Sequence, residues 1–254
     1  MIVDEIRKIA KAEDVAVLGF GPAAAMADEP AGYRPEDVLP GARGLICFGI
    51  PLPRAVYQTP SNAEEVVCRA QSHHYRRLDT LSLRLAALLE EHGQQALPIF
   101  GCTPLGINEK GDVTGYLNQI RMGEVTGIGV IGRNGLLIHS RYGSRLMLGA
   151  VVTTAALSKA SYPPQEGPGC PPDCRVCIDA CPVGAISLDE KRVRVMRCLG
   201  YTSRAPLMSK PKFFFLRAVR PAAAGRLINR TAMDEHILHV CSRCVALCPY
   251  GEGD

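Results

Sequence analysis

Short apolar runs alternate with helical patterns before residue 160. Runs of β-forming residues, bounded by glycine, proline or polar positions, predict strands at residues 15–20, 44–50, 96–100, 136–139 and 146–153. A leucine stripe between Ala63 and His92, with Gly93 as its stop, predicts a long helix, and residues 4–12 predict a shorter one. This alternation favours an α/β or α+β layer structure.

A stretch rich in proline and glycine interrupts the pattern. Residues 161–169 read Ser-Tyr-Pro-Pro-Gln-Glu-Gly-Pro-Gly, which suits neither a helix nor a central strand because proline lacks an amide donor. A cysteine motif begins directly afterwards. We therefore predict two domains, residues 1–160 and residues 161–254.

Composition is that of an ordinary globular protein. The 254 residues are 47% hydrophobic and 21% charged. No apolar run approaches the roughly twenty residues that span a bilayer, so no membrane partner is expected. The first residues carry neither a twin-arginine motif nor a basic segment followed by an apolar one, which predicts a cytoplasmic protein.

Charge adds one local feature. The net charge of +4 is too small to argue for nucleic acid, so a nucleic-acid partner is not expected. A basic run without acids follows Ser209 and contains Phe213 to Phe215. Its members are Lys210, Lys212, Arg217, Arg220, Arg226 and Arg230. The run is either a solvated face or a dock for an anionic partner, which could be an acidic electron donor of the ferredoxin or flavodoxin type or another anionic molecule.

Eight of the eleven cysteines lie in the last third of the chain. They are Cys170, Cys174, Cys177, Cys181, Cys198, Cys241, Cys244 and Cys248. Eight closely spaced thiolates fit two 4Fe-4S clusters, and the cysteine before each proline belongs to the other cluster in two-cluster ferredoxins. One predicted set is therefore Cys170, Cys174, Cys177 and Cys248, and the other is Cys181, Cys198, Cys241 and Cys244.

Zinc and disulfides are the alternatives for these cysteines. Zinc needs only the Cys-x-x-Cys pairs and leaves Cys198 and both Cys-Pro endings without a role. Disulfides need an oxidising compartment, for which the sequence carries no signal. Three residues separate Cys170 from Cys174, where the common bacterial spacing is two, so Cys170 is the least regular ligand.

Glycines cluster at residues 127–135 and again at Gly143. The Gly-x-Gly-x-x-Gly element is not a dinucleotide-binding motif, because it leads into a strand pattern rather than a helix, and no phosphate-binding Gly-Lys-Ser/Thr follows it. The glycines either form hairpin turns or line a ligand pocket with their amides. Isolated histidines such as His73, His74 and His139 are interpreted as packing or surface residues.

A family resemblance favours the pocket. Residues 129–150 resemble the glycine-rich core of the epoxyqueuosine reductases, residues 40–50 their early Ala-Arg strand, and residues 197–201 the segment around their lone cysteine. The resemblance implies an α+β protein, in which a nitroreductase-like cobalamin-binding domain precedes a ferredoxin-like domain with two 4Fe-4S clusters. Reductive dehalogenases share this arrangement.

The resemblance also implies a site. The clusters would pass electrons to a corrinoid cobalt. Corrin contacts would come from the glycine segments, namely Gly129, Gly132, Arg133, Asn134, Gly143, Ser144 and Arg145.

The sequence departs from the family in two places. Gly101-Cys102-Thr103-Pro104 stands where the family has an acidic proton donor in an Asp-x-x-Pro element. Cys102 could act as the proton donor or as a cobalt ligand, or it could be a buried core residue, as we expect for Cys47 and Cys68. The family also continues into a helical-repeat region that helps to hold transfer RNA, whereas this sequence ends soon after Pro249.

These departures lead to two functional hypotheses. The first is a corrinoid-dependent reductase of a small molecule. The second is an electron-transfer protein that reduces or processes a corrinoid, carried by itself or by a partner protein, without an organic substrate. A flavin in the first domain is a third possibility, and transfer-RNA epoxyqueuosine reduction is not expected.

Overall fold

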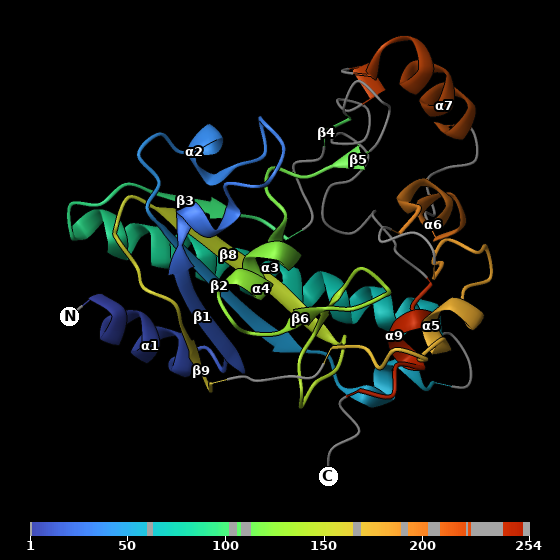
Figure 1. The fold of residues 1–254 in the computed structure, drawn as a ribbon, viewed down its shortest axis with the longest axis horizontal. Helices are drawn as coiled ribbons and strands as arrows, with labels where there is room; N and C mark the ends of the chain where they lie inside the picture. Colours follow the sequence, from blue (N-terminus) through green and yellow to red (C-terminus); the bar gives the residue numbers. More distant parts are fainter. Residues whose placement is uncertain are drawn as a thin grey trace.

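A five-stranded antiparallel sheet forms the centre of the protein (Figure 1). The computed structural model describes residues 2–59, 63–101, 106–107, 113–164, 169–188, 193–202, 209–221, 223–224 and 241–250. The strand order is β3-β8-β2-β1-β9. The strands are β1 (Val17–Pro22), β2 (Gly44–Pro51), β3 (Ala96–Ile99), β8 (Leu146–Thr153) and β9 (Ala160–Tyr162).

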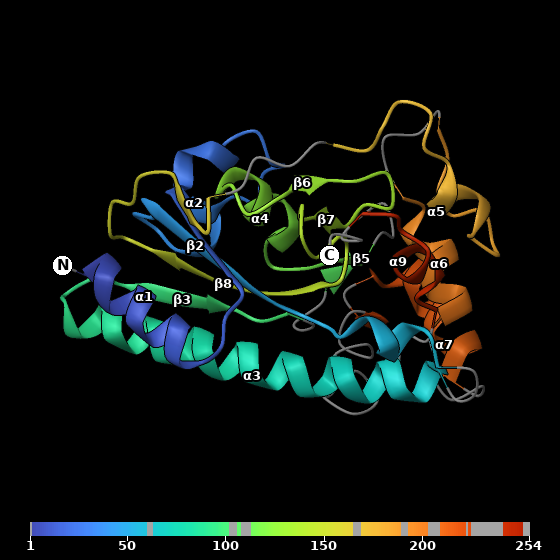
Figure 2. The ribbon, with the colours of Figure 1, turned by 90° about the horizontal axis from the view of Figure 1, so that it is seen from below.

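Helices cover both faces of the sheet (Figure 2). One face carries α1 (Ile2–Ala12) and the long α3 (Ala63–Glu91), and the other carries α4 (Gln119–Val125) together with η1 (Ala23–Met26). Strand β2 is buried along nearly its whole length, because it lies between β8 and β1 and is covered on both sides.

Alternation along β2 divides the core into two clusters. Ile46 and Phe48 belong to the cluster under α1 and α3, whereas Leu45 and Cys47 belong to the cluster under α4. This division follows from the two-residue period of a strand, in which neighbouring side chains point to opposite faces.

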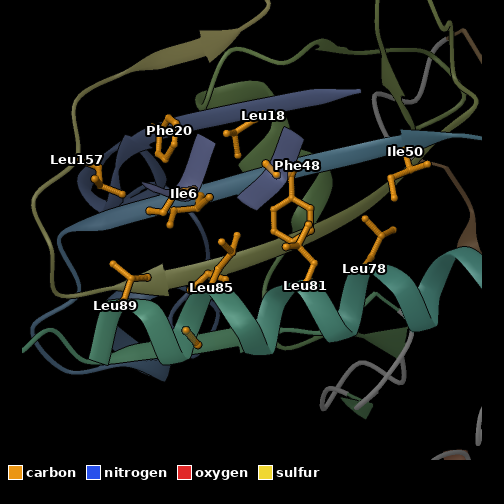
Figure 3. Close-up of a cluster of buried hydrophobic side chains, with 14 of the residues drawn as sticks. Ile6, Leu18, Phe20, Phe48, Ile50, Leu78, Leu81, Leu85, Leu89 and Leu157 are labelled. Carbon is orange, nitrogen blue, oxygen red and sulfur yellow. The ribbon is translucent and has the colours of Figure 1, made fainter. Parts of the chain in front are cut away.

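The α3 face is packed by leucines at helical spacing (Figure 3). Leu78, Leu85 and Leu89 have no exposed surface, and they pack with Ile6 of α1 against the sheet. Leu83 of the predicted stripe is 54% exposed, because 100° per residue turns it away from the sheet. The helix stops where expected, and Gly93 takes a positive φ of 72°.

Smaller elements surround the sheet. They are α2 (Pro35–Val38), η2 (Arg54–Tyr57), the pair β4 (Gly106–Ile107) and β5 (Val113–Thr114), and the hairpin β6 (Val130–Ile131) and β7 (Leu137–Ile138). Strand β9 pairs antiparallel with β1 at the edge of the sheet, so the last strand runs two residues past the predicted boundary at residue 160.

The cysteine-rich part of the chain contains short helices. They include α5 (Val176–Asp179), α6 (Val195–Thr202), α7 (Ser209–Val219) and α9 (Arg243–Ala246). In both ribbon views these helices lie at one end of the sheet (Figures 1 and 2). None of the described helices combines the length and apolar character that crossing a bilayer requires.

Candidate functional site

Two of the short helices bring the two cysteine motifs together. Helix α5 carries Cys177, α9 carries Cys244, and the two helices pack against each other. Helix α6 carries Cys198, and α9 also contacts η2, which precedes α3. The motifs are therefore neighbours in space, although Cys177 and Cys244 are 67 positions apart in the sequence.

The surroundings of Cys177 contain the other members of the first predicted set. Burial is the main cause that raises the pKa of the Cys177 thiol, and the charges of Cys170 and Cys174 raise it further, with a smaller contribution from Cys248. A through-space charge effect on the pKa requires these sulfurs to lie near one another. The structure thus brings together Cys170, Cys174, Cys177 and Cys248.

Cys244 has the second set around it. Burial raises the pKa of this thiol to about 12, and the charges of Cys198 and Cys241 add to the rise. Smaller contributions come from Cys177 and Cys181. Because Cys177 belongs to the first set, the two sets adjoin each other. Among the described residues, no three Cys, His, Asp or Glu side chains are arranged to hold a single metal ion.

Backbone amides already donate to two of the sulfurs. The amide of Arg133 lies 3.4 Å from Cys170 Sγ, and the amide of Ala185 lies 3.2 Å from Cys181 Sγ. Tyr250 joins the ends of the two motifs, since its hydroxyl donates to the carbonyl of Gly169 at 2.7 Å. Amide donors to sulfur are a typical surrounding for cluster thiolates, so this donor set fits an iron–sulfur centre.

The glycines of the first segment are explained by a tight hairpin. A Cβ on Gly129 would lie 2.7 Å from the carbonyl oxygen of Ile138, and one on Gly132 would lie 2.3 Å from Ile138 Cδ1. Gly135 adopts a positive φ of 71° at the turn. Contact of Gly129 and Gly132 with a corrin stays a prediction, but the close approach of β6 and β7 already requires residues without side chains here.

Arg133 and Asn134 point toward the cysteine loops. Besides its amide bond to sulfur, Arg133 donates from Nη2 to the carbonyls of Pro171 and Pro172, at 3.3 and 2.5 Å. Asn134 is buried, and its Nδ2 lies 3.5 Å from the carbonyl oxygen of Cys244. These two residues connect the glycine segment to both cysteine motifs.

The second glycine segment contains a buried hydroxyl without a partner. Gly143 has a positive φ of 57° and pairs with His139 across a short bridge. Ser144 is buried, and its Oγ has no hydrogen-bond partner within the described part of the protein. Arg145 donates to the carbonyl of Leu52 at 2.9 Å. A ligand that accepts from Ser144 would remove a desolvation cost of about 1–3 kcal/mol.

His139 is a site residue that the sequence did not reveal. Its Nδ1 accepts from the amides of Arg141 and Tyr142, at 3.0 and 3.3 Å, so we assign the ring proton to Nε2. Nε2 is buried and has no partner among the described atoms. Burial, with a smaller effect of Arg141, lowers the pKa of His139 to about 4, so the imidazole is neutral at pH 7.

Tyr57 is a second residue that sequence reasoning missed. Burial raises the pKa of its phenol to about 12, the charge of Arg145 opposes this rise, and the charge of Cys244 contributes to it. Tyr57 thus lies near both the second glycine segment and the second cysteine set. No sequence pattern marks it, because it stands in a short 3₁₀ turn between β2 and α3.

The remaining predicted residues separate into core and undescribed positions. Cys47 and Cys68 are buried, as predicted, and burial raises the pKa of Cys47 to about 12. Cys102, the candidate catalytic residue, lies outside the described residues. So do Arg226 and Arg230 of the basic run and the side chain of Lys210, whereas Lys212 and Arg220 are exposed and Arg217 is half-buried.

Comparison of sequences identifies epoxyqueuosine reductases as relatives. No protein-family model matches the chain. An epoxyqueuosine reductase of Lactococcus garvieae is 30% identical over 140 residues, which are 55% of this chain and 34% of that protein. An epoxyqueuosine reductase of Bacillus cereus is 26% identical over 231 residues, which are 86% of this chain and 51% of that protein. The chain thus spans about half of these relatives or less.

Solved structures share the fold. The epoxyqueuosine reductase of Streptococcus thermophilus matches with a TM-score of 0.61 at 21% identity, over 100% of this chain and 67% of that one. A reductive dehalogenase described as B12-dependent matches with a TM-score of 0.52 at 14% identity, over 97% and 40%. The mixed α+β fold is therefore that of both groups.

One comparison corrects the expected substrate. An epoxyqueuosine reductase solved with an epoxyqueuosine-modified tRNA stem loop matches with a TM-score of 0.59 at 19% identity, over 99% of this chain and 66% of that one. With the curated relatives, it points to tRNA queuosine modification. The expectations of a small-molecule substrate, of a substrate-free electron carrier and of no nucleic-acid partner are therefore wrong.

The error has a simple origin. Those expectations rested on the small net charge and on where the sequence ends, neither of which identifies a substrate, and on the motif at Cys102, a residue outside the described part of the chain. The family resemblance itself is confirmed by both kinds of comparison. This chain is similar in sequence to epoxyqueuosine reductases, and it shares its fold with them and with the reductive dehalogenases.

Proposed function

We propose that the protein reduces epoxyqueuosine in tRNA, using two iron–sulfur clusters and a cobalamin. In this proposal residues 1–160 form a nitroreductase-like cobalamin-binding domain and residues 161–254 a ferredoxin-like domain with two 4Fe-4S clusters. The observation that carries the proposal is the 3.4 Å contact between the amide of Arg133 and Cys170 Sγ. It joins the segment expected to face the corrin directly to a cluster ligand.

The grouping of the cysteines supports the cluster assignment. Cys170, Cys174, Cys177 and Cys248 would hold one cluster, and Cys181, Cys198, Cys241 and Cys244 the other. The charges of Cys170, Cys174 and Cys248 raise the pKa of Cys177, and those of Cys198 and Cys241 raise the pKa of Cys244, which supports this division. Each Cys-Pro cysteine would then join the opposite set. Because the two sets adjoin each other, electrons have a short path between the clusters.

The fit of cobalamin rests on two buried donors. Ser144 Oγ and His139 Nε2 have no partner among the described atoms, and buried polar groups are nearly always paired. Both can donate a hydrogen bond, and the amide groups at the edge of a corrin can accept one. Bound cobalamin would supply a low-valent cobalt as the reductant, while the protein positions the ring and limits the access of water.

Basic and aromatic side chains support an RNA substrate. Between Lys191 and Met233 the sequence contains eleven Lys and Arg residues and no Asp or Glu. In the described part, Arg197, Lys212 and Arg220 are exposed, and so are the rings of Tyr201 (49%) and Phe215 (65%). Lysine and arginine neutralise phosphates, and exposed rings stack on unpaired bases, as in single-stranded RNA loops.

The reaction removes one oxygen atom from the substrate. Two electrons and two protons convert the epoxide to an alkene and release water. His139 is neutral at pH 7 and carries its proton on Nε2, so it is suited to hydrogen bonding rather than to supplying a charge. The clusters would pass the electrons singly, since each changes by one electron at a time.

A reconstitution assay tests the proposal. The protein is purified and loaded anaerobically with iron, sulfide and cobalamin, reduced chemically, and incubated with a tRNA stem loop that contains epoxyqueuosine. Mass spectrometry of the digested RNA should show a loss of one oxygen atom. Protein that holds both clusters and cobalamin but leaves this RNA unchanged would refute the proposed function.

Variants separate the cofactors from the fold. Cys177→Ser should remove about half of the bound iron, because it disrupts one of the two proposed clusters. Cys68→Ala is the matched control, since Cys68 is buried in the first domain outside both sets. Absorbance titrations with cobalamin and with flavin report separately on the cofactor; binding of flavin alone would exclude the corrinoid part of the proposal.

A further inference from the structure

The turn from Gly132 to Gly135 contacts three separate parts of the cysteine-rich region. Arg133 reaches Cys170 and the carbonyls of Pro171 and Pro172. Asn134 reaches the carbonyl of Cys244. Gly135 packs so closely on Val193 that a Cβ there would lie 2.8 Å from Val193 Cγ2. Segments 37 to 110 residues away along the chain thus meet one turn.

We infer that Arg133 is a positioning residue that raises the reduction potential of the cluster bound through Cys170. The inference rests on the proposed clusters but not on the RNA substrate. It concerns the reduction potential of one cluster, which donates electrons, whereas the RNA substrate accepts them.

Two contacts of Arg133 act in the same direction. Reduction makes a cluster more negative, so a hydrogen bond to a ligand sulfur and a nearby positive charge both favour the reduced form. The amide provides the hydrogen bond, at 3.4 Å from Cys170 Sγ. The guanidinium provides the charge, and its bonds to Pro171 and Pro172 hold it beside the residues that directly follow Cys170.

Within the described part of the protein, no acidic side chain forms an ion pair with Arg133, and the carbonyls to which it donates are neutral. Arg175, one residue after Cys174, differs in this respect, because its Nη2 lies 3.6 Å from Asp179 Oδ1. An arginine keeps its charge at all relevant pH values, so the effect of Arg133 does not depend on pH.

Arg133 also holds the loop. Its planar guanidinium group donates to the carbonyls of two successive residues, Pro171 and Pro172. A lysine at the same position would carry a compact ammonium charge on a flexible side chain. Arg133→Lys therefore keeps the charge and loses the defined geometry. Arg133→Gln loses both the charge and the guanidinium hydrogen bonds.

The test is an anaerobic redox titration followed by electron paramagnetic resonance. It uses the full-length protein with its clusters and needs no substrate. The potential of the Cys170 cluster is recognised as the step that moves in Cys170→Ser. In Arg133→Gln this step should move to a lower potential while the other step stays nearly in place, and Arg133→Lys should restore most of the difference. Arg175→Gln is the matched control and should have the smaller effect.

Each outcome decides the inference. A selective fall of the potential in Arg133→Gln that Arg133→Lys rescues supports it, whereas loss of the cluster in Arg133→Gln shows a purely structural role and overturns it. Unchanged potentials with full iron content overturn it, and so does an equal change of both steps. If the wild-type protein assembles no 4Fe-4S cluster, the cofactor part of the proposed function fails instead, and iron and sulfide analysis detects this independently.

Discussion

Acid should destabilise the protein through His139. His139 is only 1% exposed, and burial is the main cause that lowers its pKa from 6.5 to about 4. A lowered histidine pKa means that the unfolded chain takes up the proton first, so stability is complete above pH 6.5 and decreases as the pH falls toward 4. His139→Asn removes this titration and keeps an acceptor near the position of Nδ1.

The magnitude follows from the two pKa values. At pH 7.5 the imidazole is neutral in both states, and at pH 5.5 it is protonated almost only when the chain is unfolded. The wild-type free energy of unfolding should therefore fall by about 1.3 kcal/mol more than that of His139→Asn between these pH values. The common effects of other titrating groups cancel in this difference.

Urea unfolding, followed by circular dichroism under anaerobic conditions, measures the effect. Wild type and His139→Asn are compared at pH 7.5 and pH 5.5, and His73→Asn serves as the control for removing an exposed imidazole. Parallel pH dependence of wild type and His139→Asn would refute the assignment of a buried, neutral imidazole.

Three further predictions concern the core and the basic surface. Leu85→Ala should lower the free energy of unfolding by about 2–5 kcal/mol, because Leu85 is fully buried between α3 and the sheet; a loss below 1 kcal/mol in urea unfolding would contradict this packing. Gly149→Ala should cost about 1–3 kcal/mol, since its Cβ would lie 2.6 Å from Phe48 Cε2, and Phe48→Leu in the same chain should recover part of the loss. Lys212→Glu should weaken binding of the tRNA stem loop and reduce the salt dependence of its affinity, as measured by fluorescence anisotropy. An affinity equal to that of the wild type at low salt would show that Lys212 does not contribute to RNA binding.

Much of the sheet could be predicted from the apolar pattern. The runs at residues 44–50 and 146–153 are β2 and β8, and the leucine stripe is α3. Strand β9 was not predicted, because Ser161 and Tyr162 stand at the start of a proline-rich stretch and form only an edge strand. Strand order could not be predicted either, since a period of two defines a strand but not its neighbours.

Local glycine patterns were less informative than they seemed from the sequence. Gly129 and Gly132 are required by the close approach of the hairpin β6–β7, whatever ligand lies beyond it. His139 carries no motif, and only its burial distinguishes it from the exposed His73. Burial of a single side chain is a property of the whole fold, so no local window of sequence reports it.

The local chemistry of this protein could be predicted from its amino-acid sequence. Cysteine spacing defined two motifs suited to iron–sulfur clusters, because three ligands of a cluster come from one short loop. Which elements meet depends on the tertiary structure: Cys170 and Cys248 both lie near Cys177, and Arg133 reaches a sulfur 37 residues away. Such contacts depend on how the sheet and helices pack, and that packing is the sum of many weak contacts spread over the whole chain.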